Sequence, residues 1–514
     1  MSSTEAANGS RSLNGLLRVL GGIERLGNKL PHPFWLFVIL AGVLALVSWG
    51  LAAAGVSAVN PASGKAVAAK NLLSADGVRT MIDGAIDNYT SFAPLGTILV
   101  VMLGVAVAER SGLLAAVLRS GVAKVSPRWV TFALAFTGMV SHVASDAAYV
   151  VLIPLGALAF RAVGRSPILG IVVAFVSISA GYDASPLVTP VDAILSGLTT
   201  AAAQTIDPNY VVTPLANYFF SIASSLVLAT VITLVTERVL ARRVESLPVD
   251  SDADEDDLGS LTLRPEERRG LRAALIALVV FAAALVLAVL PTGSPLRGED
   301  GSIVQSPLLG SIAIFLALAF LTVGWAYGRA AGTITSSRDI PDFMAHGLRE
   351  MAPILVLFFA ISQFLAFFKW TGIGEIIAIN GADLLKSAGV SGPVVFLGIL
   401  VVVTVINLVV TSGSAQWALV GPVFVPMLML LDIPPEYTQA LYRIADSCTN
   451  AITPMSPYFV MALGFLQRYR RSAGIGTLAS MTIPLAFALL VVWTLLFLVF
   501  WWLGIPLGPG APVA

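Results

Sequence analysis

The chain has 514 residues, of which 57% are hydrophobic and 12% charged, and its formal net charge is zero. Soluble domains carry about 25% charged residues, so this composition excludes an ordinary soluble protein. The lack of a basic excess excludes nucleic acid as an expected partner. Apolar runs of about 20 residues can cross a hydrocarbon core of ~30 Å, and the short alternating segments of a β-barrel are missing. We therefore predict an all-α polytopic membrane protein.

The sulfur and imidazole content limits the possible cofactors. Cys448 is the one cysteine, which excludes a disulfide framework and a cysteine-based metal site. The three histidines are too scattered to form a metal cluster. No metal or organic cofactor is expected, and the coupling ion of a transporter, H⁺ or Na⁺, is the one small ion that the sequence leaves open.

Nine segments are predicted to span the membrane, and the first is too long for the apolar core of a signal peptide and lacks a cleavage site. They are 33–55, 92–109, 166–200, 216–238, 270–291, 307–328, 350–369, 436–467 and 477–504. Two further apolar stretches, 129–161 and 393–432, are about 35–40 residues long and have a polar break in the middle. They do not have the pattern of simple spans.

The distribution of Lys and Arg sets the orientation, because cytoplasmic loops carry the excess of positive charge. Arg128 and Arg161 flank the first broken stretch and both favour the cytoplasm, so this stretch is predicted to be a re-entrant hairpin. Its tip would be SHVASDAA (141–148), entering from inside. The second hairpin would have the tip TSGSAQWA (411–418) and enter from outside. Irregular backbone at that depth requires protein or water around it.

The predicted organisation has two transmembrane halves joined by an acidic linker. The segments are a cytoplasmic N-terminal segment 1–32, a first half 33–244 with hairpin 129–161, a cytoplasmic linker 245–269, a second half 270–504 with hairpin 393–432, and a C-terminal tail 505–514.

The two halves repeat one another at a spacing of 268 residues. The pairs at this spacing are Pro154 and Pro422, Pro167 and Pro435, Pro186 and Pro454, and Tyr149 and Trp417. The span at 92–109 would run outside to inside and its counterpart at 350–369 inside to outside. We therefore predict an inverted repeat, an architecture common among secondary transporters.

Each hairpin is followed by a span that prolines interrupt, and charged residues gather there. The breaks contain Pro186, Pro190, Pro454 and Pro457, and the nearby charged residues are Asp146, Asp183, Asp192, Arg443 and Asp446. Five such charges would cost on the order of 12–18 kcal/mol if each cost roughly 2.5–3.5 kcal/mol unpaired, which exceeds the stability of a typical fold. They must pair, face water or be neutral.

These residues have a functional and a structural interpretation. Arg443 could bind a substrate carboxylate bidentately, and Asp192 could carry a proton. Arg443 and Asp446 are three residues apart on one predicted helix, so a direct pair between them is expected. The structural alternative is that buried charges tie the two halves together, with Asp146 capping a half-helix.

Neutral side chains near the breaks have the same two interpretations. Ser145, Ser414 and Asn450 could supply oxygens to a coupling ion, with Asp146, Asp183, Asp192 and Asp446 as the titratable candidates. Trp417 could stack on a substrate ring or pack into the scaffold. His142 could relay protons or form structural hydrogen bonds. Trp493, Trp501 and Trp502 are expected in an interfacial aromatic belt.

Long strings of this chain resemble the p-aminobenzoyl-glutamate transporter (AbgT) family. They are SHVASDAAYVVLIPLGALAFRAVGRSP, TPVDAILSGLT and SAQWALVGPVFVPMLMLLDIPPEYTQALYRIADSCTNAITPMSPYF, and the resemblance extends over roughly residues 30–505. It implies a homodimeric, multi-pass transporter of the bacterial inner membrane with nine spans and two hairpins. Members of the family import p-aminobenzoyl-glutamate or export sulfonamide antimetabolites, driven by the proton motive force or sodium.

The resemblance also assigns substrate-binding residues by position. The family's functional Asp, Trp, Pro and Arg fall on Asp192, Trp417, Pro435 and Arg443, and Asp446 lies in the same motif. One departure is the sequence Asp183-Ala184-Ser185, where the family pattern is Ser-Ala-Asn. It adds a carboxylate and removes an amide, which bears on the substrate and the coupling ion.

The sequence features bear on three possible functions. The leading prediction is a secondary transporter of p-aminobenzoyl-glutamate or related aryl compounds, including sulfonamides. The alternative is a sodium-coupled dicarboxylate carrier of similar hairpin architecture. An intramembrane enzyme would need Asp146 and Asp192 to form an aspartyl dyad, and the lack of further catalytic groups argues against it. The sequence does not decide between import and export.

Overall fold

The protein is described here by a computed structural model. It covers residues 31–59, 64, 66–122, 125–144, 147–244, 249–250, 262–298, 301–303, 306–390 and 392–513. The predicted N-terminal segment 1–32 and acidic linker 245–269 lie largely outside the described residues. Nearly all the described elements are helices, as the sequence predicts. The exception is a short antiparallel pair, β1 (Ser57–Val59) and β2 (Ala66–Ala68).

The helices fall into two consecutive sets. The first contains α2 (Pro33–Ala53), α3 (Ala75–Asp83), α4 (Ala85–Thr90), α5 (Ala93–Arg110), α6 (Leu113–Val122), α7 (Val130–Val140), η1 (Ser141–Ala144), α8 (Ala147–Ala162), α9 (Pro167–Ser179), α10 (Pro190–Ala203), α11 (Tyr218–Val235), η2 (Thr236–Leu240) and α12 (Ala241–Val244). The second contains α13 (Pro265–Val289), α14 (Pro307–Gly310), α15 (Ile312–Ala331), α16 (Asp339–Glu350), α17 (Ala352–Trp370), α18 (Ile373–Ser387), α19 (Gly392–Asn407), α20 (Gly413–Met429), α21 (Pro435–Asn450), α22 (Pro457–Tyr469) and α23 (Ile475–Trp502).

Seven of the described helices are long and apolar enough to cross a membrane. They correspond to seven of the nine predicted spans. The other two, 166–200 and 436–467, are the helix pairs α9–α10 and α21–α22, each with a non-helical break. Pro190 and Pro457 occupy the first positions of α10 and α22, where the missing N–H is not needed. The predicted interruption of both spans is therefore confirmed.

Each of the two stretches predicted to be a re-entrant hairpin contains a pair of helices. The first consists of α7 with η1, followed by α8, and the second of α19 followed by α20. The predicted second tip, 411–418, is displaced, because α20 already begins at Gly413 and the connection is 408–412. The Gln416 backbone N–H bonds the Ser412 carbonyl, and its side chain bonds the Val403 carbonyl of α19. These bonds allow polar residues to form the first turn of a buried helix.

The order of elements repeats between the two halves of the chain. The series α5, α6, α7–α8, α9–α10, α11 is followed by α17, α18, α19–α20, α21–α22, α23. Pro167 and Pro435 begin α9 and α21, and Pro154 and Pro422 lie inside α8 and α20. The 268-residue spacing is therefore consistent with a repeat, and the repeat itself stays a prediction. The opposite orientation of the two series in the membrane stays a prediction.

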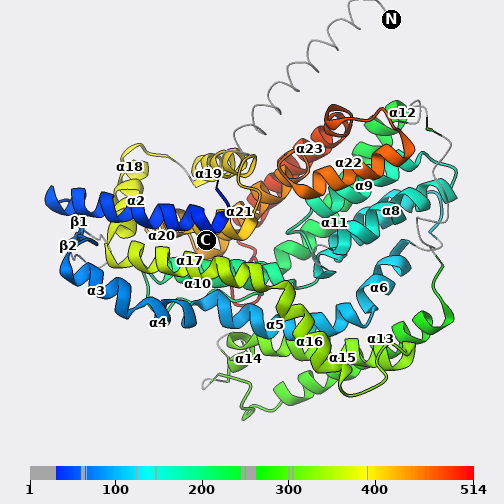
Figure 1. The fold of residues 1–514 in the computed structure, drawn as a ribbon, viewed down its shortest axis with the longest axis horizontal. Coiled ribbons are helices and arrows are strands. Elements are labelled where there is room, and N and C mark those ends of the chain that lie inside the picture. The colour runs from blue at the N-terminus through cyan, green and yellow to red at the C-terminus, as the bar shows by residue number, and fades with distance from the viewer. Residues whose placement is uncertain are drawn as a thin grey trace, which may run out of the picture.

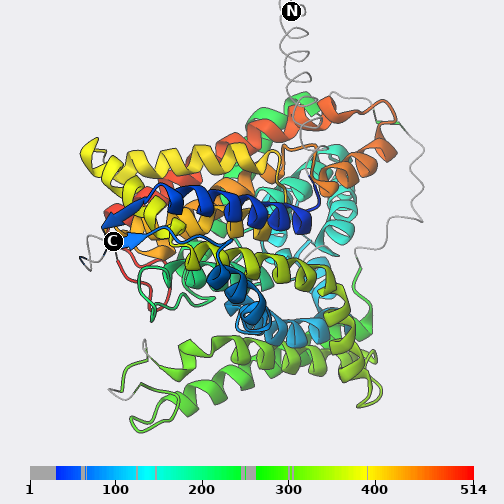
Figure 2. The same ribbon diagram turned by 60° about the vertical axis from the view of Figure 1, so that its left-hand side comes forward.

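Helices α13 and α15 form a layer along one side of the molecule, at the bottom of Figures 1 and 2. Only 11% of the residues in the most apolar 18-residue stretch of α13 are buried, as expected for a helix that faces lipid. The backbone of α15 approaches α5 closely at Gly104, where an added Cβ would lie 2.1 Å from the Ala317 carbonyl oxygen. Small residues allow such contacts between membrane helices.

The aromatic belt is only partly as expected. Trp502 is 79% exposed near the end of α23, which fits an interfacial position. Trp493, by contrast, is 1% exposed, and its Nε1 donates to the Ser224 hydroxyl of α11 at 2.7 Å. The prediction for Trp493 is therefore wrong, because one face of α23 packs against α11 and that pairing cannot be read from composition.

Candidate functional site

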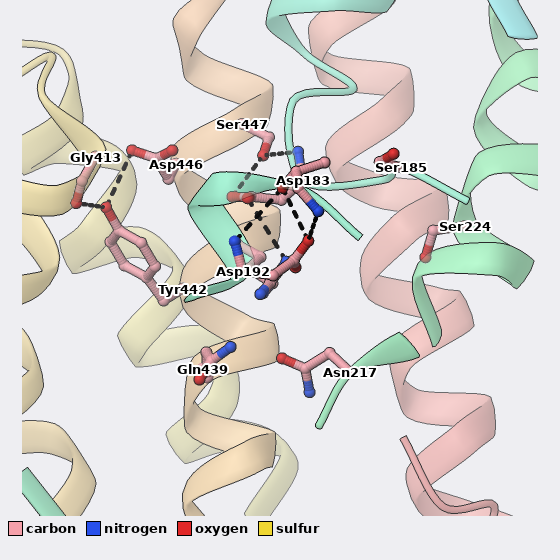
Figure 3. Close-up of polar contacts among 12 residues, drawn as sticks. Asp183, Ser185, Asp192, Asn217, Ser224, Gly413, Gln439, Tyr442, Asp446 and Ser447 are labelled. Carbon is pink, nitrogen blue, oxygen red and sulfur yellow. Dashed lines mark hydrogen bonds and ion pairs between the residues drawn. The ribbon is translucent and has the colours of Figure 1, made fainter. Parts of the chain in front are cut away.

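Arg443 lies at the centre of a buried polar cluster between the two helix breaks. It belongs to α21 and is 2% exposed. Its Nη1 is 2.7 Å from Asp192 Oδ1 and 3.7 Å from Asp183 Oδ1. Both carboxylates come from the broken span of the first half, Asp183 from the break and Asp192 from α10. The cluster therefore joins the two halves of the chain (Figure 3).

The beginning of α10 fixes the position of Asp192. Asp192 Oδ2 accepts bonds from the Thr189 backbone N–H at 2.7 Å and from its hydroxyl at 2.8 Å. The Thr189 hydroxyl in turn accepts the Asp192 N–H at 3.4 Å. This is a capping box, with Pro190 in the first helical position. One oxygen of Asp192 thus caps the helix, and the other faces Arg443.

Ser447 holds Asp183 from the opposite side. Its hydroxyl donates to Asp183 Oδ2 at 3.2 Å and accepts the Asp183 backbone N–H at 3.1 Å. Ser447 lies four residues after Arg443 on α21, so the two side chains share a face of that helix. Asp183 is the carboxylate by which this sequence departs from the family pattern, and the structure places it in the cluster.

Asp446 lies beside the Tyr442 hydroxyl, which also contacts Gly413 at the start of α20 (Figure 3). Its Oδ1 accepts the Tyr442 hydroxyl at 3.2 Å, and its Oδ2 accepts the Asn450 amide at 3.4 Å. The Tyr442 hydroxyl also donates to the Gly413 carbonyl at 2.5 Å. The expected pair between Arg443 and Asp446 is not formed. A spacing of three residues allowed it, but Arg443 turns instead to the carboxylates of the facing break.

Asn407, the last residue of α19, joins this second polar group. Its amide donates to the Asp446 carbonyl at 2.7 Å, to the Thr449 hydroxyl at 2.6 Å and to Asn450 Oδ1 at 3.1 Å. Its own Oδ1 is buried without a partner among the described residues. Carboxylate, amide and carbonyl oxygens therefore gather where hairpin α19–α20 meets α21.

Trp417 is completely buried in α20. Its Nε1 donates to the Thr199 hydroxyl of α10 at 3.0 Å, and its ring centre is 4.5 Å from that of Tyr442. The Thr199 hydroxyl donates at 2.7 Å to Gln439 of α21. In this conformation the indole is a packing element that joins α20, α10 and α21.

The remaining predicted residues are dispersed. Pro435 begins α21, eight residues before Arg443, which is about 12 Å along a helix. Ser414 is half-buried in the first turn of α20. Ser145 and Asp146 lie outside the described residues, so the proposed dyad of Asp146 and Asp192 has no described geometry.

His142 is 3% exposed, and its ring meets that of Tyr182 edge to face at 5.0 Å. Its Nε2 has no partner in the described part of the chain. These contacts place the imidazole beside the first helix break, in which Tyr182 lies.

Several residues of the cluster were missed by the sequence reasoning. The Thr189-x-x-Asp192 spacing is a capping-box pattern and could have been recognised. No such signal marks Tyr442, Ser447 and Asn407. The residue type of a polar side chain on a buried helix does not show which partner it contacts. Their roles depend on the packing of α19, α20 and α21.

The cluster has more negative than positive groups. Asp183 and Asp192 face the Arg443 guanidinium, and Asp446 lies in the neighbouring polar group. With all four groups ionised the net charge would be three negative plus one positive, or −2. Arg443 Nε also has no partner among the described residues. A buried excess of charge is costly unless protons or cations neutralise it. The cluster is thus suited to bind H⁺ or a monovalent cation together with a polar ligand.

Comparison with known proteins identifies similar chains that match this one over nearly its whole length. The sequence matches the AbgT putative transporter family over residues 18–514. A relative from Escherichia coli strain K12, named p-aminobenzoyl-glutamate transport protein, is 39% identical over 494 residues, or 96% of each chain. The Alcanivorax borkumensis YdaH transporter, described as having an unusual topology, is 41% identical with a TM-score of 0.88 over 93% of this chain and 100% of its own.

A further solved structure is MtrF of Neisseria gonorrhoeae, described within a class of antimetabolite efflux pumps. It is 40% identical with a TM-score of 0.90, over 96% of this chain and 100% of its own. Family, fold and apolar helices agree with the sequence-based expectation. The chain belongs to the AbgT transporter family and is a multi-pass protein of the bacterial inner membrane.

Proposed function

We propose that this protein is a secondary active transporter of p-aminobenzoyl-glutamate or related aryl compounds, including sulfonamide antimetabolites. The name of the Escherichia coli relative supports the first substrate, and the description of MtrF supports the second. The transported molecule would contact the cluster of Arg443, Asp192 and Asp183 between the two helix breaks. Membership of a transporter family favours this function over intramembrane aspartyl chemistry.

The charge of the cluster is the observation that carries the proposal. A substrate with carboxylates would meet two acidic side chains, Asp183 and Asp192, and one guanidinium that already pairs with Asp192. Binding would therefore require that Asp192 or Asp183 be neutralised, which would release Arg443 toward the substrate. Protonation of a carboxyl would couple anion binding to proton uptake. The proton motive force is accordingly the proposed energy source.

Sodium is the second candidate for the coupling ion. It is favoured by the oxygen atoms near the second hairpin: the Asp446 carboxylate, the Gly413 carbonyl and the unpartnered Asn407 Oδ1. Oxygen ligands suit a hard cation. Coupling to Na⁺ would also fit the alternative substrate class, aliphatic dicarboxylates.

Transport into proteoliposomes tests the proposal. Labelled p-aminobenzoyl-glutamate should accumulate when a pH gradient is imposed without Na⁺, and Asp192→Asn should abolish this accumulation. Asp76→Asn, at a surface carboxylate whose side chain is 83% exposed, is the matched control and should transport normally. Uptake that follows a Na⁺ gradient, ignores pH and is inhibited by succinate would replace the proposal with the alternative. Normal uptake by Asp192→Asn would remove Asp192 from the coupling site.

The homodimer implied by the family resemblance is part of the same proposal. The expected result is a particle of twice the mass of the 53.7 kDa chain, after subtraction of detergent, by light scattering. A monomeric mass with full transport activity would contradict it.

A further inference from the structure

An apolar cavity of about 440 Å³ lies beside the first helix break. Its walls come from α6, the tip of hairpin α7–α8, the break before α10, the start of α11 and the layer of α13 and α15. Binding sites for small organic molecules have volumes of about 300–1,000 Å³ and are mostly apolar with a few polar groups. The cavity fits that description.

The cavity adjoins the ion-pair cluster through the peptide bond between Val188 and Thr189. Val188 lines the cavity, and the N–H of this bond donates to Asp192 Oδ2 at 2.7 Å. Since a peptide C–N bond is about 1.33 Å long, the Val188 carbonyl carbon lies within about 4 Å of the Asp192 carboxylate. A ligand ring in the cavity would therefore lie next to the backbone that holds Asp192.

The described residues of the cavity wall include two polar side chains, and one of them is available to a ligand. The Ser141 hydroxyl is already used, because it donates to the Gly138 carbonyl at 2.6 Å. The Tyr218 hydroxyl, in contrast, has no hydrogen-bond partner among the described residues, and Tyr218 is half-buried at the start of α11. A phenol hydroxyl can donate to or accept from a ligand.

We propose that this cavity receives the aromatic ring of the transported molecule, and that the Tyr218 hydroxyl binds the polar substituent on that ring. This inference rests on the proposed function and places the aryl part of the substrate in the cavity beside the first helix break. Trp417, the other candidate for an aryl partner, is fully buried against Tyr442 in this structure and offers no open face.

Protection of an introduced cysteine tests the location. Val117→Cys places a thiol in the cavity wall, and the native Cys448, 1% exposed, should not react with N-ethylmaleimide. We expect 4-aminobenzoate and p-aminobenzoyl-glutamate to slow alkylation of Val117→Cys at least fivefold, and glutamate to leave it unchanged. Ala283→Cys, exposed on α13 and outside the cavity, is the control and should react equally with every addition.

Several results would overturn the inference. It fails if no aryl compound protects Val117→Cys, or if glutamate protects as well as 4-aminobenzoate does. It also fails if phospholipid alone protects the thiol and aryl compounds add nothing, since the cavity would then hold an acyl chain. Protection is measured in detergent, whereas uptake is measured in proteoliposomes. Absence of wild-type uptake would therefore refute the proposed function, and the protection experiment would still decide whether aryl compounds bind in the cavity.

Transport kinetics supply a second test. Ala319→Phe would fill part of the cavity and should raise the KM for p-aminobenzoyl-glutamate about tenfold with kcat within twofold, whereas Ala283→Phe should change neither. Tyr218→Phe should weaken binding of the amino-substituted compound about three- to tenfold and leave binding of benzoyl-glutamate unchanged. Equal effects on both compounds would show that Tyr218 does not contact the ring substituent.

Discussion

Arg443 is positioned by two carboxylates of the first half of the chain, although it belongs to the second. Asp192 Oδ1 and Asp183 Oδ1 share the same Nη1, and Nε remains without a partner among the described residues. A guanidinium has five N–H donors, so this arrangement leaves capacity for a further acceptor. The residue can thus serve as a structural counter-ion and as a ligand-binding group without moving far.

The structural part of that role predicts a stability effect. Arg443→Gln would leave two buried carboxylates without a counter-ion and should lower the free energy of unfolding by about 3–5 kcal/mol. Adding Asp192→Asn to Arg443→Gln should recover part of the loss, because one uncompensated charge disappears. Thermal unfolding in detergent would measure both effects.

Arg79→Gln is the matched control for this experiment, because its side chain is 75% exposed and pairs only with a surface carboxylate. It should unfold at the wild-type temperature. A double variant less stable than Arg443→Gln alone would contradict the counter-ion role of Arg443.

Sequence reasoning identified the charged members of this cluster but not their pairing. Asp183, Asp192 and Arg443 were identifiable because ionised groups in apolar segments are rare and must be compensated. The partner of Arg443 was predicted to be Asp446, its neighbour on the same helix. The path of the break before α10 determines which carboxylates reach Arg443. Hydrogen bonds from Asp183 to Ser447 and from Thr189 to Asp192 help to fix that path.

Among the secondary structure elements, hairpin α19–α20 depends on α21 for its geometry. The Tyr442 hydroxyl donates to the Gly413 carbonyl, and the Gln416 amide donates to Val403 within the hairpin. The backbone N–H groups of residues 408–410 bond carbonyls at the end of α19, and the Tyr442 and Gln416 side chains add bonds that link the start of α20 to α21 and to α19.

Tyr442→Phe tests that dependence. The change keeps the ring beside Trp417 and removes the hydroxyl that bonds the Gly413 carbonyl and Asp446 Oδ1. The bond to Gly413, which restrains the connection, is worth about 0.5–1.5 kcal/mol. Amide exchange of residues 408–414 should therefore accelerate roughly 2- to 12-fold. Tyr89→Phe, which removes a bond to the Leu355 carbonyl between α4 and α17, should leave this segment unchanged. Equal exchange in both variants would show that Tyr442 does not restrain the hairpin.

The crossing of α5 and α15 depends on Gly104. A side chain at this position would overlap the backbone of α15, so Gly104→Val should destabilise the protein by about 1–3 kcal/mol. Gly96→Val is the matched control on the same helix, because no atom lies within 4 Å of an added Cβ there. The comparison is made by thermal unfolding, and equal midpoints for the two variants would contradict a close helix contact at Gly104.

Element boundaries could be predicted where strong signals mark them. The prolines at 167, 190, 435 and 457 each begin a helix, and the hydrophobic runs fixed seven spans. The second hairpin connection was misplaced by a few residues, because Thr411 to Gln416 has turn-like composition. Burial and the bonds from Gln416 to Val403 and from Tyr442 to Gly413 accompany the conversion of most of that stretch into helix.

At the scale of the whole molecule, the repeated order of elements predicts an inverted arrangement in the membrane. Single cysteines at positions 128 and 161, both exposed and on either side of hairpin α7–α8, should react with an impermeant maleimide from the same face. Because the native Cys448 is buried, the wild-type chain should not be labelled and serves as the blank. Labelling from opposite faces would make the hairpin an ordinary crossing and would remove the repeat symmetry.

The pairing of Arg443 with Asp192 also has a consequence for biogenesis. Helix α21 has 16 residues, about 24 Å at 1.5 Å per residue, and carries Glu436, Arg443 and Asp446, so a translocon would not release it into lipid by itself. A nascent chain emerges with its N-terminal half first. The Asp192 carboxylate in α10 is therefore synthesised before the Arg443 guanidinium in α21. Arg443 can pair with Asp192 as soon as α21 leaves the translocon.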